Sequence, residues 1–124
     1  MNLLQTLNTF ASSANTNPHV QRITRGWSVN IHLECLEGDH RYLLEVKEGT
    51  IANVSQITES EHRQATVMDA HDHVLLRTDN QCFTDIFAGQ RNPALASLEG
   101  DLEVYGDESH SVKLDAITLI LWGL

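Results

Sequence analysis

The stretch FTDIFAGQRNPALASLEGDLEVYGD, residues 83–107, decides the fold because it sets a helix, a short helix and a strand in a fixed order. Phe83, Ile86 and Phe87 recur at helical spacing and predict the apolar face of the first helix. Gly89 predicts the end of that helix, since glycine readily adopts the left-handed conformation that follows a last helical turn.

The second half of the stretch predicts a short helix and a short strand. Asn92 is a favoured N-cap, and Pro93 is a favoured first helical residue. We expect this short helix to bury one side, formed by Ala94, Leu95 and Leu98. Gly100 starts a new segment, and residues 102–105 predict a strand that Gly106 ends.

The residues before the stretch predict a strand and a helix cap. Residues 73–77 are the clearest part of a strand that we expect to begin near Val67. Thr78 to Gln81 match a capping box, in which Thr78 is the N-cap and the Gln81 side chain reaches back to it.

The chain ends in a helix whose last turns have almost no polar side. Asp107 is its expected cap. Its apolar residues are Val112, Leu114, Ala116, Ile117, Leu119, Ile120, Leu121 and Trp122. Such a helix needs cover, so it completes an ordinary core, closes a cavity or forms a dimer contact.

The first half of the chain predicts a short helix and three strands. Helical spacing of the apolar residues Leu3, Leu4, Leu7 and Phe10 predicts the helix. The polar segment from Ala11 to Pro18 is expected to end it. The helix either packs on the rest of the domain or stays free. Residues 27–35 alternate apolar and polar side chains, which is typical of a half-buried strand. Turns at 37–40 and 47–50 then separate the strands at 42–46 and 51–57, giving an antiparallel meander. The predicted fold class is α+β: a mostly antiparallel, meander-like sheet of five strands with helices packed on one side.

Composition excludes several classes of protein. The chain has 124 residues, 41% of them apolar, which is the size of one folded domain, residues 1–124. Its formal net charge of −9 disfavours nucleic acids and anionic membrane surfaces as partners. The N-terminus lacks the basic region of a signal peptide, and no window is apolar enough for an integral membrane segment, so we expect a cytoplasmic protein. Cys35 and Cys82 each lie in an apolar pattern and are expected to be buried thiols.

The order of glycines, proline and aspartate in this stretch resembles that of the sterol carrier protein type 2 family. Helix, glycine, short proline-initiated helix, strand, Gly-Asp and terminal apolar helix follow in the family's order, with five matching positions, Gly89, Pro93, Gly100, Gly106 and Asp107. Asp101 departs from the lysine that is frequent there. The resemblance covers roughly two thirds of the chain and leaves the N-terminal helix and linker, residues 1–25, outside it.

The resemblance implies a hydrophobic tunnel between sheet and helices that holds a fatty acid, acyl chain, sterol-like or isoprenoid lipid. It implies no reaction chemistry, although related domains serve as accessory modules of larger enzymes. The residues expected to line the tunnel are Phe83, Ile86, Phe87, Leu95, Leu98, Leu114, Ile117 and Leu121. Spacing alone favours core filling for the first five of them, and for the three residues of the terminal helix it leaves core filling and cavity lining open. The alternative is a module for protein interaction or homodimerisation that uses the C-terminal helix and carries no lipid.

Catalytic and metal-binding signals are weak. The sequence has none of the common nucleophile, phosphate-loop, dinucleotide or zinc-protease motifs. We therefore predict a protein that is not an enzyme and needs no cofactor. His71 and His73 would lie on one side of a strand and could contribute two metal ligands, but two ligands do not make a site. A cone-shaped isomerase-like barrel with a buried aspartate is disfavoured, because that fold ends in strands and this chain ends in a helix.

Overall fold

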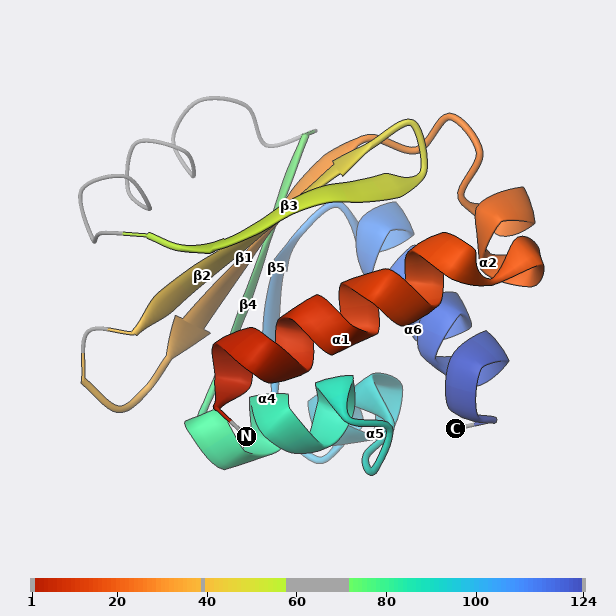
Figure 1. Cartoon of the computed structure of the whole chain (residues 1–124). Coiled ribbons are helices and arrows are strands. Elements are labelled where there is room, and N and C mark those ends of the chain that lie inside the picture. The colour runs from red at the N-terminus through yellow and green to blue at the C-terminus, as the bar shows by residue number, and fades with distance from the viewer. Residues whose placement is uncertain (1, 39, 58–71, 124) are drawn as a thin grey trace.

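The computed structural model describes residues 2–38, 40–57 and 72–123. Within these residues the elements follow in the order α1 (Leu3–Thr16), α2 (Pro18–Ile23), β1 (Val29–Cys35), β2 (Arg41–Lys47), β3 (Thr50–Gln56), β4 (His73–Thr78), α4 (Asn80–Phe87), α5 (Pro93–Leu98), β5 (Glu103–Gly106) and α6 (Glu108–Trp122). The strands form one sheet, and the helices collect on one of its faces (Figure 1). The α+β class predicted from the sequence is confirmed.

The sheet has the strand order β3-β2-β1-β4-β5. The expected meander is present, because β1 pairs antiparallel with β2 and β2 pairs antiparallel with β3. The fourth strand differs from a simple meander: β4 lies beside β1 and runs parallel to it, with Asn30 opposite His73. A final antiparallel pair places Val74 opposite Gly106 of β5. The sheet is therefore mixed and mostly antiparallel.

The faces of the sheet follow the alternation in the sequence. Val29, Ile31, Leu33 and Cys35 of β1 are buried towards the helices, as the period of two predicts. Both cysteines are free and buried, which confirms the expectation of two buried thiols.

Helix α1 is longer than expected. Asn2 and Gln5 form a capping box at its start, and the helix passes through the predicted polar stop to end at Thr16. The prediction of a stop was wrong because Ala11 and Ala14 extend the buried face of Leu7 and Phe10 by one turn. The helix packs on β3 and α4 rather than staying free.

A second short helix, α2, follows at once. Asn17 ends α1 and caps α2, where its side chain accepts hydrogen bonds from the backbone N–H groups of His19 and Val20. Pro18 then occupies the first turn, a position that needs no N–H donor.

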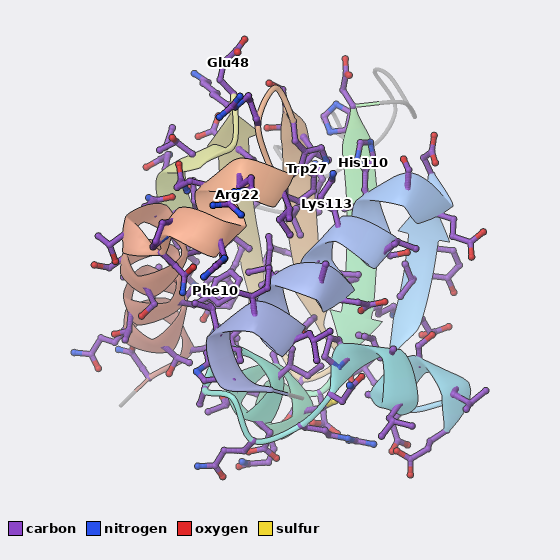
Figure 2. All side chains as sticks on the ribbon, turned by 90° about the vertical axis from the view of Figure 1, so that its right-hand side faces the viewer. Phe10, Arg22, Trp27, Glu48, His110 and Lys113 are labelled. Carbon is purple, nitrogen blue, oxygen red and sulfur yellow. The ribbon has the colours of Figure 1, made fainter. Side chains whose placement is uncertain are left out.

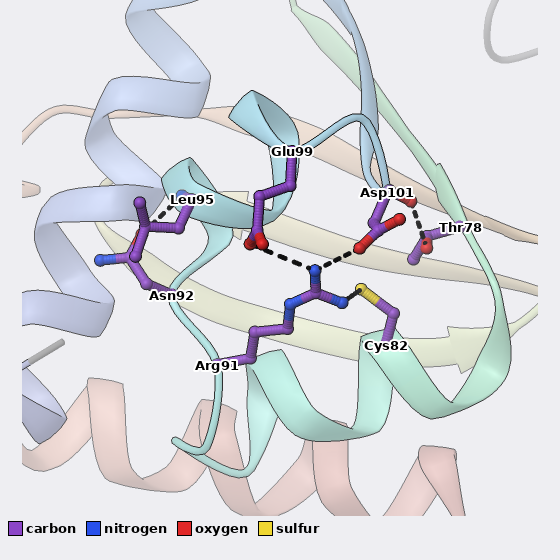
Figure 3. A network of polar contacts seen from close by, with 7 residues as sticks. All are labelled: Thr78, Cys82, Arg91, Asn92, Leu95, Glu99 and Asp101. Carbon is purple, nitrogen blue, oxygen red and sulfur yellow. Dashed lines mark hydrogen bonds and ion pairs between the residues drawn. The ribbon is translucent and has the colours of Figure 1, made fainter.

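Helix α4 begins one residue later than the predicted capping box. Asp79 is its N-cap and accepts a 2.7 Å hydrogen bond from the backbone N–H of Cys82. Thr78, the expected cap, instead donates its hydroxyl to the backbone carbonyl of Asp101 at 2.7 Å (Figure 3). An aspartate accepts strongly at a helix start, so the threonine is left to bind the loop before β5.

Helix α5 buries a different side from the one predicted. Pro93 and Ala96 are buried, whereas Leu95 is 55% exposed and Leu98 is 82% exposed. Ala94 is exposed as well. The prediction of a side buried through Ala94, Leu95 and Leu98 was wrong because a six-residue helix touches the body along one narrow line, here set by Pro93 and Ala96.

Arg91 fixes the loop that precedes α5 (Figure 3). Its guanidinium binds the carboxylates of Glu99 and Asp101 and donates to Cys82 Sγ at 3.3 Å. Asp101, which departs from the family's frequent lysine, therefore has a local partner in this chain. The network connects α4, α5 and the start of β5.

Helix α6 begins as predicted, with the Asp107 side chain accepting from the backbone N–H of Ser109. Leu114 and Ile117 bury its inner face, and Trp122 at its end contacts the ring of Phe10 with centroids 5.9 Å apart. Gly89 lies directly under Trp122, where an added Cβ would come within 2.5 Å of the indole ring.

Candidate functional site

Most residues predicted to line a tunnel lie in the packed core. Phe83, Ile86, Phe87, Leu114 and Ile117 are buried together between sheet and helices, and Leu121 is partly buried. Helix α1 packs against them, and the ring of Phe10 meets that of Phe87 edge-on at 5.0 Å. Leu95 and Leu98 are not part of this group. The sequence therefore located the apolar layer, but most of that layer is filled by its own side chains.

A cleft of about 200 Å³ lies at the β5 end of this layer, between the sheet, α5 and the first half of α6. Its residues are Leu76, Pro93, Ala94, Ser97, Leu102, Val104, Glu108, Ser111, Val112, Leu114 and Asp115. Most of them are apolar, and the polar ones lie on the two helices. The cleft can hold a short hydrocarbon segment with a polar end near α6.

Sequence reasoning named one residue of this cleft, Leu114. The others carried a usable signal. Residues 108, 111, 112 and 115 follow the helical i, i+3, i+4, i+7 spacing and so form one stripe of α6. Leu76, Leu102 and Val104 alternate towards the helices on β4 and the β5 segment. Only the position of β5 next to β4 brings these two patterns together.

The polar groups of the cleft are acidic or neutral. Burial raises the pKa of the Asp115 carboxyl above its ordinary value of 3.8. Among the described residues that line the cleft, none is a lysine, arginine or histidine. A desolvated carboxylate without a cation beside it is an unusual feature for an apolar cleft.

The first half of α6 is held in place over the cleft by polar contacts with the α2–β1 region (Figure 2). Trp27 Nε1 donates to His110 Nδ1 at 2.9 Å, and Lys113 Nζ donates to the carbonyl of Ile23 at 2.8 Å. The rings of Trp27 and His110 also lie against each other, with their centroids 6.2 Å apart. These contacts position the stripe of α6 that lines the cleft, and no pattern in the sequence pointed to them.

A second cleft of about 230 Å³ lies at the other end of α6. It is bounded by α1, the end of α4 and Trp122, with Phe10 and Phe87 in its wall and three hydroxyl residues of α1, Thr6, Thr9 and Ser13, at its edge. Phe87 is the one predicted lining residue there.

The weak metal candidates are only partly described. His71 lies outside the described residues. His73 places its Nδ1 3.0 Å from Nε2 of His32, on the sheet face opposite the helices. Within residues 2–38, 40–57 and 72–123, no group of three histidine, cysteine or acidic side chains gathers around one point.

The described cysteines are poorly suited to nucleophilic chemistry. Burial, reinforced by nearby Glu37, raises the pKa of the Cys35 thiol to about 11, so it is protonated at neutral pH. Cys82 is also buried and lies under the guanidinium of Arg91.

No helix in the described part of the chain is long and apolar enough to cross a membrane.

Comparison with solved structures identifies the architecture. The chain superposes on a crystal structure of sterol carrier protein 2 with a TM-score of 0.66, over 98% of this chain and 95% of that one, at 11% sequence identity. The fold is that of sterol carrier protein 2. The family resemblance predicted from the glycine and proline pattern is confirmed at the level of structure.

Two further matches show the settings in which this fold occurs. Palmitated SCP2L2 from Aedes aegypti matches with a TM-score of 0.62, over 95% of both chains at 15% identity. The alkylsulfatase Pisa1 from Pseudomonas sp. matches with a TM-score of 0.55 at 13% identity, over 84% of this chain but 14% of the enzyme. The sterol carrier fold thus also forms a part of a larger enzyme.

No protein-family model matches the sequence, and no curated protein matches it either.

Proposed function

We propose that this protein binds and carries a hydrophobic small molecule and catalyses no reaction. The observation that carries the proposal is the cleft between β4, β5, α5 and α6, whose lining residues are mostly apolar, in a chain with the sterol carrier protein 2 fold. The palmitated relative supports a lipid as the class of ligand. The partial match to a sulfatase supports a further role beside a lipid-modifying enzyme.

The size of the cleft sets how a lipid would bind. Typical ligand pockets measure roughly 300–1,000 Å³, so a cleft of about 200 Å³ accepts only part of a long chain in its present shape. Ala94 and Ser97 of α5 line it, and Leu98 projects from the same short helix into solvent. We infer that α5 shifts to admit a longer lipid tail, and that this tail then covers the exposed side chain of Leu98.

We also infer that residues 1–124 form one domain, including the segment that lay outside the sequence resemblance. Helix α1 packs on β3 and α4, and α2 packs on α6, so the N-terminal segment covers the same core as the rest of the chain.

The test is ligand binding by delipidated protein. Nile red, an uncharged dye that fluoresces in apolar sites, is titrated with the protein and then displaced by single-chain lipids. We expect saturable displacement and a matching adduct in native mass spectrometry. Absence of both across acids, alcohols, amines and sterols would contradict the proposal.

The second candidate is an interaction module without a lipid. Val112 and Leu119 lie seven residues apart on α6 and are 56% and 57% exposed, which favours a contact through this helix. Multi-angle light scattering distinguishes the two functions. A homodimer that the double substitution Val112→Ser, Leu119→Ser converts to monomer would support the interaction module.

A further inference from the structure

The described lining of the cleft contains acidic residues and no basic ones. Of the described residues that line it, Glu108 and Asp115 are acidic, Ser97 and Ser111 are hydroxylic and the rest are apolar. Both acids lie on the same stripe of α6, on either side of Ser111. The polar wall of the cleft therefore carries negative charge, and its two carboxylates are hydrogen-bond acceptors.

Two donors near this wall, on α6, are already engaged. The Ser111 hydroxyl donates to the backbone carbonyl of Glu108 at 2.9 Å. At the start of α6, the backbone N–H of Ser109 is bound by the Asp107 carboxylate at 2.9 Å. Glu108 adds a further negative charge in the same first turn, so the positive end of the helix dipole is offset before a ligand arrives.

The described cations of α6 and of the elements beside the cleft have partners outside it. Lys113 Nζ binds the Ile23 carbonyl on the α2 side of α6, Arg77 pairs with Glu103, and Arg91 binds Glu99 and Asp101. Burial raises the pKa of the Asp115 carboxyl, and no lysine, arginine or histidine is among the described residues that line the cleft with it. A lipid carboxylate placed here would meet two like charges.

We propose that this cleft selects a lipid whose head group donates hydrogen bonds and carries no negative charge, with a protonated long-chain amine bound best, an alcohol next and a fatty-acid carboxylate last. This rests on the proposed function and names the ligand class of the same site. The apolar wall holds the chain, and Glu108 and Asp115 accept from the head group. A single like-charge contact at an interface of this kind is worth about a tenfold change in affinity.

The experiment compares three ligands of equal chain length, dodecylamine, dodecanol and dodecanoate, below their micelle concentrations at pH 7 and low salt. Each displaces Nile red from wild-type protein and from three variants. Asp115→Asn and Glu108→Gln remove a negative charge from the cleft. Glu48→Gln removes one from the exposed β2–β3 turn, away from β5 (Figure 2), and controls for attraction of amines to the protein's net charge.

We expect dodecylamine to bind at least about tenfold more tightly than dodecanoate to the wild type. Asp115→Asn and Glu108→Gln should each shrink that ratio several-fold, chiefly by improving dodecanoate, while Glu48→Gln leaves it unchanged. Dodecanoate binding as tightly as dodecylamine, or a ratio that responds equally to all three substitutions, would overturn the ligand class and leave lipid binding intact. Failure of all three ligands to displace the dye would overturn the proposed function together with this inference.

Discussion

The two ends of the layer between sheet and helices differ in kind. At the end covered by α1 and α4, Phe10, Phe83 and Phe87 are buried to 2% exposure or less and contact one another. At the end covered by α5 and α6, the same layer opens into a cleft whose wall includes two carboxylates. The packed end holds the aromatic cluster, although a cleft of about 230 Å³ also opens beside Phe10 and Phe87 there. The open end is distinguished by the carboxylates in the wall of its cleft, and it is where we propose that a ligand binds.

The largest expected effect comes from opening the packed end. Phe10→Ala should lower the free energy of unfolding by about 3–5 kcal/mol, because it removes an aromatic ring that is 1% exposed. Urea denaturation measures it. Leu98→Ala, at a leucine 82% exposed beside the cleft, is the control and should change stability by less than about 0.5 kcal/mol. Equal losses in both variants would remove the distinction between the two ends.

The contact between α6 and the α4–α5 turn gives the next largest effect. Gly89 has φ +81°, and a Cβ there would lie 2.5 Å from the Trp122 ring. Gly89→Ala should therefore cost more than Gly100→Ala, which has φ +86° but open space around it. Gly100→Ala, the control, measures the cost of placing a Cβ at a left-handed backbone conformation alone, which is about 1–2 kcal/mol. Thermal unfolding of the pair measures the difference, and equal melting temperatures would show that Trp122 does not pack on this turn.

The smallest effect concerns the charge in the cleft. Burial raises the folded-state pKa of Asp115 above 3.8, so the folded protein binds this proton more tightly than the unfolded chain does. The contribution of Asp115 to stability is therefore full below pH 3.8 and is lost as pH rises through the folded-state pKa. Asp115→Asn should make the protein slightly more stable at neutral pH.

That gain should vanish in acid, because Asp115 is then protonated in both states. Urea denaturation at several pH values follows it. Glu48→Gln, at the exposed β2–β3 turn, provides the matched charge change. A gain for Asp115→Asn that is the same at every pH would contradict a buried, titrating carboxyl.

Local signals in the sequence predicted a large part of the fold. The alternation of residues 27–35, the cap at Asp107 and the glycine at 89 each act within a few residues, so their outcome is readable from the chain. Two predictions were wrong, one where neighbouring residues compete to cap a helix and one where a short helix has only a narrow contact with the core. Asp79 displaced Thr78 as a cap, and Pro93 with Ala96 displaced Leu95 and Leu98 from the buried side of α5.

The cleft was less predictable because it depends on contacts between distant segments. The parallel pairing of β1 with β4 and the placement of β5 beside β4 bring Leu76 and Val104 under α6. The contacts Trp27–His110 and Lys113–Ile23 then orient the stripe from Glu108 to Asp115. Separations of 83 and 90 residues leave no local pattern to read.

The most direct test of a ligand-binding open end is to fill it. Ser97→Trp puts a large side chain into the cleft, and Ser12→Trp puts the same side chain on the exposed side of α1, where Ser12 lines none of the described clefts. Dissociation constants for a bound single-chain lipid are measured by Nile red displacement in both variants, with urea denaturation to confirm folding. We predict that Ser97→Trp weakens binding by about tenfold or more while Ser12→Trp leaves it unchanged. Undiminished binding by folded Ser97→Trp would show that the ligand lies elsewhere and would contradict the account.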